Sequence, residues 1–184
     1  GREETRVEHE RQGNTVLTWR WVIDGPLIPV FEGLKDFGGN VDRWHYYNLY
    51  LPCTAVIDFG SADASLKIGE DERDRGNRIF SIHLMTPVSE NYTIDRWMHV
   101  RNTATETDEA SRKIDQMFEV AFSEDKAILE AVHAEEQRPM KRRPIRIAID
   151  RGPMVYRKRI AELLERERTN DASAPGNGAY VFHD

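Results

Sequence analysis

Asp125 lies in a helical pattern at a position where a charged side chain is costly. If residues 108–137 form a helix, Asp125 shares a face with a set of apolar residues: Phe118, Ala121, Phe122, Ile128, Leu129 and Val132. A carboxylate that leaves water without a partner costs several kcal/mol, so a buried Asp normally has a hydrogen-bonded partner, a raised pKa or a metal ion. The spacing therefore predicts a buried Asp125, which is either a structural residue paired with an Arg or with backbone amides, or a functional carboxylate.

Few other residues have a pattern that indicates chemistry. His83 shares a predicted strand face with Ile79, Ser81 and Met85, where a His is more often a hydrogen-bonded core residue than a ligand. Cys53 lies on an apolar strand face, which favours an inert thiol. The six histidines show no metal-ligand spacing, and the HExxH, GxSxG, P-loop and GxGxxG motifs are all missing from the sequence.

The composition is typical of one globular domain and excludes several classes of protein. The 184 residues are 39% hydrophobic and 32% charged, with a net charge of −6, which argues against a nucleic-acid partner. With one cysteine there is no intrachain disulfide, and with no apolar run of membrane-spanning length we expect a cytoplasmic protein without a membrane partner. The chain starts with Gly1 in place of Met, which predicts a piece of a longer protein.

The order of the predicted elements indicates an α+β domain, with helices packed against one face of an antiparallel sheet. Strands are predicted at 15–23, 43–59, 78–85 and 92–102, and Pro52 implies an edge position or a bulge in the second of them. The Asp125 helix follows, then a short extended link at 145–149 and a last helix that begins near Pro153. Residues 169–184, rich in Ala, Gly, Asn and Ser, are predicted to form a flexible tail.

Several segments together resemble one enzyme family, the Rieske non-haem iron oxygenases. Residues 122–131 (FSEDKAILEA) are similar to the segment that supplies the carboxylate of the family's mononuclear iron site. Three more agree with the vanillate O-demethylase and dicamba monooxygenase branch, namely VDRW at 41–44, HLMTP at 83–87 and IDRGP at 149–153. The resemblance runs in consistent order from about residue 40 to residue 168.

The resemblance implies a helix-grip catalytic domain, an antiparallel sheet curled around a long C-terminal helix with the substrate between them. Residues 1–168 would be the C-terminal part of that domain, incomplete at the N-terminus. Asp125 matches the Asp that binds Fe(II) together with two His. His83 matches a position that lines the substrate pocket, and Pro52 falls near another; Phe118 and Phe122 are expected to line the same pocket.

Two features of the family have no match in this sequence. A [2Fe-2S] Rieske cluster needs a CxH and CxxH pair, and the DxxHxxxxH helix that carries the two iron-binding His is also missing. The resemblance therefore implies that this portion is inactive alone. It also implies that the complete protein is a homotrimer that receives electrons from NAD(P)H through a reductase or ferredoxin. The implied substrate is a small aromatic molecule, such as an aromatic acid.

Two alternatives remain open at this point. A helix-grip domain without redox activity could bind a small aromatic or lipid ligand in its cavity. A small hydrolase or isomerase could instead use Asp125 as a general base together with His83.

Overall fold

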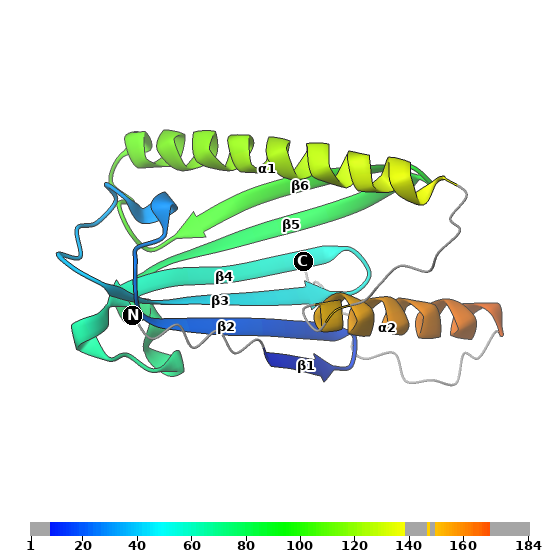
Figure 1. The fold of residues 1–184 in the computed structure, drawn as a ribbon, viewed down its shortest axis with the longest axis horizontal. Coiled ribbons are helices and arrows are strands. Elements are labelled where there is room, and N and C mark those ends of the chain that lie inside the picture. Colours follow the sequence, from blue (N-terminus) through cyan, green and yellow to red (C-terminus); the bar gives the residue numbers. More distant parts are fainter. Residues whose placement is uncertain (1–7, 139–146, 148–149, 170–184) are drawn as a thin grey trace, which may run out of the picture.

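The protein folds into one antiparallel sheet and two long helices, and the computed structural model describes residues 8–138, 147 and 150–169. The sheet is a meander in which each strand pairs with the next, from β1 at one edge to β6 at the other (Figure 1). Its strands are β1 (Glu8–Gln12), β2 (Thr15–Gly25), β3 (Val41–Tyr50), β4 (Thr54–Asp63), β5 (Asn77–Ser89) and β6 (Tyr92–Arg101). The helices are α1 (Asp108–Glu136) and α2 (Arg151–Arg168), with three short 3-10 helices, η1 (Pro29–Phe31), η2 (Ala64–Leu66) and η3 (Glu70–Arg75).

The predicted strand at 43–59 is wrong as a single element, because the chain reverses there into a hairpin. Tyr50 pairs with Thr54 across a three-residue turn that contains Pro52. Proline cannot donate to a ladder, so the strand ends before it. Antiparallel pairing sets His45 opposite Phe59 and Tyr47 opposite Ile57, so these four side chains share one face of the sheet.

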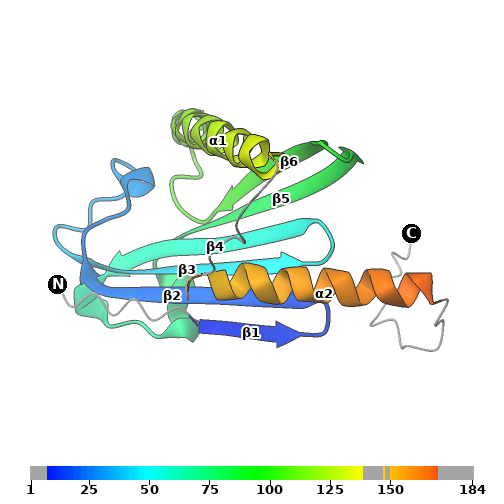
Figure 2. The ribbon, with the colours of Figure 1, turned by 45° about the vertical axis from the view of Figure 1, so that its right-hand side comes forward.

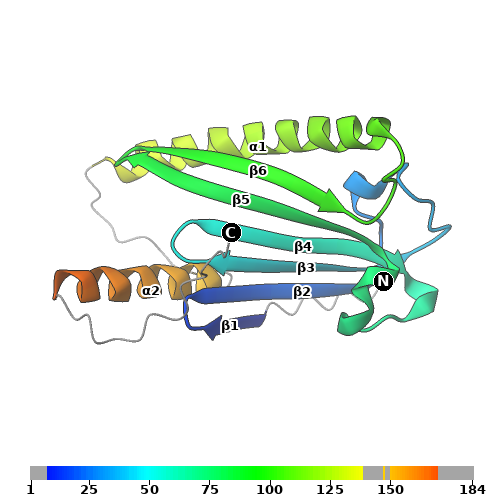
Figure 3. The same ribbon diagram turned by 180° about the vertical axis from the view of Figure 1, so that it is seen from behind.

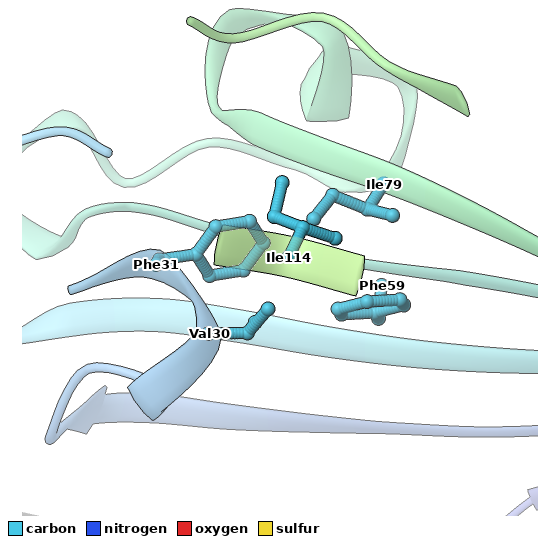
Figure 4. Close-up of a cluster of buried hydrophobic side chains, with 5 residues drawn as sticks. All are labelled: Val30, Phe31, Phe59, Ile79 and Ile114. Carbon is cyan, nitrogen blue, oxygen red and sulfur yellow. The ribbon is translucent and has the colours of Figure 1, made fainter. Parts of the chain in front are cut away.

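Helix α1 runs alongside β5 and β6 at one side of the sheet (Figures 1 and 3). Its N-terminal half is held by a buried cluster in which Ile114 meets Val30 and Phe31 of η1, Phe59 of β4 and Ile79 of β5 (Figure 4). The Arg101 guanidinium donates to the carbonyls of Thr103 and Ala104 and to Ser111 Oγ, which ties the end of β6 to the first turns of α1. This arrangement confirms the predicted α+β helix-grip fold.

The opposite face of the sheet has its own core, formed around Trp44, Tyr46, Ala62 and Ile68. The charged segment 70–75 forms η3 there and sets Arg73 over the Tyr46 ring, 4.0 Å from its centroid. Asp58, 4% exposed, accepts two hydrogen bonds from Arg78 at 2.9 and 2.7 Å. Asp58 on this face is therefore a buried carboxylate that is ion-paired with Arg78.

Helix α2 packs at the ends of the first strands (Figure 2). Arg159 donates to Asn14 Oδ1 in the β1–β2 turn, and the Tyr156 hydroxyl donates to the Pro52 carbonyl. Residue 147 alone of the predicted link at 145–149 is described, and the predicted tail lies outside the described residues beyond Thr169. Within the described part of the chain, neither long helix is apolar enough to cross a membrane.

Candidate functional site

A cavity of about 350 Å³ lies between α1 and the sheet, which is within the size range of small-molecule sites. Its walls are mostly aromatic and aliphatic, and four strand residues add polar groups: His45, Tyr47, Ser81 and His83. Helix α1 contributes Met117, Phe118, Ala121 and Phe122. The strand residues reach the cavity because alternate side chains of β3, β4 and β5 point to the same face. Such a cavity suits a small, flat, largely apolar molecule with a few polar substituents.

One wall of the cavity is a hydrogen-bonded chain of four side chains. The His83 Nδ1 lies 2.8 Å from Asp95 Oδ2, and the His83 Nε2 lies 2.9 Å from Ser81 Oγ. Ser81 Oγ also lies 3.1 Å from the His99 Nε2. Ser81 and His83 lie on one face of β5, and Asp95 and His99 lie on the same face of the neighbouring β6. The register of the two strands brings all four side chains together.

If Asp95 is ionised and His83 is neutral, the hydrogen-bond partners fix where the protons of this chain lie. An ionised Asp95 can only accept, so the His83 Nδ1 donates to it and the His83 Nε2 accepts from the Ser81 hydroxyl. The Ser81 oxygen then accepts from the His99 Nε2, which leaves the His99 Nδ1 as an acceptor, and that atom is buried without a partner among the described residues. Burial, with the nearby His83, lowers the pKa of His99 to about 4, which agrees with a neutral ring. Both ring nitrogens of His83 are thus engaged within the protein.

Aromatic rings connect this wall to α1. The Phe122 ring makes edge contacts with both His83 and Trp97, at centroid distances of 5.2 Å each. The Phe118 ring stacks on His99 at 4.0 Å and meets Phe59 edge-on. The structure therefore brings three sequence-predicted site residues, His83, Phe118 and Phe122, to one cavity. Their role as substrate contacts remains a prediction.

Asp125 is exposed, so the prediction that it is buried is wrong. The stripe on which it lies packs against the sheet as far as Phe122, whereas further along α1 Ile128 and Leu129 are 63% and 66% exposed. Periodicity identifies an apolar face but not what covers it, and the described residues cover only the first half. His83 pairs with Asp95 and not with Asp125, and the alternative of a hydrolase or isomerase that uses Asp125 as a general base together with His83 stays a hypothesis.

Pro52 does not line this cavity. It is exposed in the β3–β4 turn, where its carbonyl accepts from Tyr156 of α2. Its predicted contact with a substrate has no support from the described geometry.

The described residues do not assemble a complete metal site. Among them no three His, Cys, Asp or Glu side chains come close enough to hold an ion together. Among the described residues nothing pairs with the Asp125 carboxylate, so it can serve as one ligand, but the other two would have to come from outside these residues. A two-His, one-carboxylate iron site therefore does not fit this part of the chain alone.

Several site residues were missed by sequence reasoning: His45, Tyr47, Ser81, Asp95 and His99. A signal for them existed in the alternation of the strands, since each shares its strand face with residues that pack under α1. What the alternation did not reveal was the register that sets Asp95 and His99 near Ser81 and His83.

Comparison with known proteins decides the family. Residues 1–166 match the family described as the vanillate O-demethylase oxygenase C-terminal domain. The chain belongs to this family. The match covers the sheet, α1 and nearly all of α2, so the cavity and Asp125 both lie within the family's domain.

Two curated relatives are similar along most of the chain. The toluene-4-sulfonate monooxygenase system iron-sulfur subunit of Comamonas testosteroni is 28% identical over 172 residues, which are 92% of this chain and 49% of that protein. The vanillate O-demethylase oxygenase subunit of Pseudomonas sp. (strain ATCC 19151) is 26% identical over 188 residues, covering 96% of this chain and 55% of that one. The chain thus spans about half the length of these relatives.

The fold is shared with a solved enzyme structure. Apo dicamba monooxygenase superposes with a TM-score of 0.69 at 15% identity, over 90% of this chain and 51% of that one. At this identity the likeness establishes the fold alone.

Proposed function

We propose that the chain forms the substrate-binding wall, and supplies one metal ligand, of a Rieske-type oxygenase that hydroxylates or O-demethylates an aromatic acid. The observation that supports this most is the continuity of the cavity with Asp125. Phe118, Phe122 and Asp125 follow at helical positions i, i+4 and i+7, so they lie on one face of α1, and Asp125 is one turn beyond the cavity-lining Phe122.

The chain's own residues would bind and orient the substrate. The rings of Phe59, Phe118 and Phe122 offer apolar and edge-on contacts to a flat aromatic ring. The Ser81 hydroxyl, held by His83, has a lone pair left to accept from a polar substituent. A mononuclear Fe(II), when bound, would supply the activation of O₂.

The remaining parts of the proposed enzyme lie outside the described residues. They are two His ligands, a [2Fe-2S] Rieske cluster, and a reductase or ferredoxin that delivers electrons from NAD(P)H, in a homotrimer within the cytoplasm. One cysteine cannot supply the two that a Rieske cluster needs, so we expect no turnover from these 184 residues alone.

Replacing the proposed iron ligand tests this function. In the complete gene product, Asp125→Ala is expected to lower mononuclear iron occupancy at least 10-fold and to abolish oxygenation, because one of three protein ligands is lost. Glu124→Ala is the matched control, since Glu124 is the exposed neighbouring carboxylate on α1. Full iron content and activity in Asp125→Ala would disprove the ligand role.

One observation favours a second candidate, a redox-inactive domain that binds a small aromatic or lipid ligand. The cavity is complete within the described residues, whereas the metal site is not. An absorbance spectrum and iron analysis of the complete gene product separate the two functions. A red-brown protein with bound iron supports the oxygenase, and a colourless, iron-free protein that binds aromatic ligands supports the alternative.

A further inference from the structure

Three buried nitrogens on neighbouring residues of β2 and β3 have no hydrogen-bond partner among the described residues. They are Arg20 Nε, Arg43 Nε and His45 Nδ1. Buried polar groups are normally hydrogen-bonded, so three orphaned atoms in one place need an explanation. A ligand that accepts hydrogen bonds would provide one.

The sheet register places these residues together and on the cavity side. Arg20 stands directly opposite His45, and the next pair on the same face sets Val22 opposite Arg43. His45 in turn stands opposite Phe59, and both line the cavity. Because directly opposed residues have Cβ atoms about 5 Å apart, the Arg20 side chain begins one strand away from the cavity wall.

Among the described residues no carboxylate neutralises the two guanidinium groups. Arg43 Nη1 donates to the Pro26 carbonyl at 3.2 Å, and neither arginine has an ion pair within the described ranges 8–138 and 150–169. Burial and the two positive charges lower the pKa of His45 to about 4, so the neutral ring adds no third charge. Two adjacent half-buried cations attract an anion, and guanidinium geometry suits a carboxylate or sulfonate, whose oxygens accept two parallel hydrogen bonds.

The wall at His83 is less suited to an anion. Asp95 already holds the His83 Nδ1 at 2.8 Å, and Ser81 occupies its Nε2. An anion there would meet the Asp95 carboxylate as a like charge and would have to displace an existing hydrogen bond. The end of the cavity at His45 therefore suits an anion better than the end at His83 does.

We propose that Arg20, Arg43 and His45 form a subsite for the carboxylate or sulfonate of an aromatic ligand whose ring occupies the cavity. The inference rests on the proposed function only for the identity of the ligand as substrate. Binding to the subsite requires neither iron nor electrons, so it can be tested apart from oxygenation.

The test compares an anion with a neutral ligand of the same shape. Binding of benzenesulfonate and of benzenesulfonamide to the complete gene product would be measured by calorimetry or ligand-observed NMR. Arg20→Met is expected to weaken benzenesulfonate binding about 10-fold or more and to leave benzenesulfonamide within about 2-fold. Arg96→Met is the matched control, because Arg96 is an exposed residue of β6 whose side chain alternates to the other face.

A more conservative variant separates charge from geometry. Arg20→Lys keeps the positive charge but loses the two parallel N–H donors of the guanidinium, so we expect an intermediate loss of affinity for benzenesulfonate. This variant replaces Arg20→Met if Arg20→Met does not fold. Equal losses for both ligands, or none, would overturn the subsite.

The two proposals fail in different ways. If Asp125→Ala keeps its activity while Arg20→Met loses benzenesulfonate selectively, the ligand role of Asp125 is wrong and the subsite stands. If Arg20→Met binds both ligands normally while Asp125→Ala loses iron, the subsite is wrong and the oxygenase stands.

Discussion

The imidazole of His83 is held from both sides, by Asp95 at Nδ1 and by Ser81 at Nε2. This makes Asp95 a positioning residue, since it fixes which nitrogen of His83 carries the proton without lining the cavity itself. A His that is fixed in this way holds the Ser81 hydroxyl, which lines the cavity, in one orientation. The contribution of His83 to ligand binding is therefore expected to depend on the Asp95 carboxylate.

Removing that carboxylate should change the tautomer of His83. In Asp95→Ala, the fraction of His83 protonated at Nδ1 is expected to fall, because the acceptor that stabilised the Nδ1–H is gone. Ring-nitrogen ¹⁵N NMR shifts report this directly, and Arg96→Ala, the neighbouring exposed residue, serves as the control. The Asp95 side chain is 41% exposed, so the loss of folding free energy should be only about 1 kcal/mol. Unchanged ¹⁵N shifts would contradict the positioning role.

Helix α1 is anchored by its first half. Ile114 is 2% exposed within a five-residue cluster, whereas Leu129 is 66% exposed on the same helix. The apolar residues that follow Phe122 on this face, Ile128, Leu129 and Val132, are 63%, 66% and 49% exposed. The helix can still be a single unit, because its 29 residues share one continuous run of backbone hydrogen bonds.

Two alanine substitutions measure this asymmetry. In the 184-residue chain, Ile114→Ala is expected to cost about 2–5 kcal/mol of unfolding free energy, because it opens a cavity between η1 and the sheet. Leu129→Ala, of identical chemistry but exposed, should cost less than about 0.5 kcal/mol. Urea denaturation gives both values, and similar losses for the two variants would show that the C-terminal half of α1 is covered after all.

The sheet as a whole buries two histidines in their neutral form, which couples folding to pH. The pKa of His45 and that of His99 are both lowered from 6.5 to about 4, chiefly by burial. Between these values the unfolded chain binds more protons than the folded one, so stability is complete above pH 6.5 and falls as the pH drops towards 4.

Denaturation at several pH values tests this coupling. We expect a loss on the order of 3 kcal/mol between pH 7 and pH 4, after allowance for the partial exposure of both rings. The double variant His45→Gln, His99→Gln should show a flatter profile, since it removes both titrating groups. A slope unchanged in that variant would assign the acid sensitivity to other residues.

Local patterns in the sequence determined much of this molecule. The alternation of side chains identified the strands at 15–23, 78–85 and 92–102, and it correctly grouped Ser81 with His83 on one face. The 3.6-residue period identified α1 and set Phe118, Phe122 and Asp125 on one side of it. These properties depend on neighbours in the chain, so the sequence alone is enough to predict them.

Only the tertiary structure decided which groups meet. The β5–β6 register places Asp95 beside His83, and the β2–β3 register places Arg20 beside His45. The exposure of Asp125 likewise depends on where the sheet stops covering α1. Pairing between strands and the reach of a packed face arise from contacts between distant segments, and no periodicity within one segment encodes them.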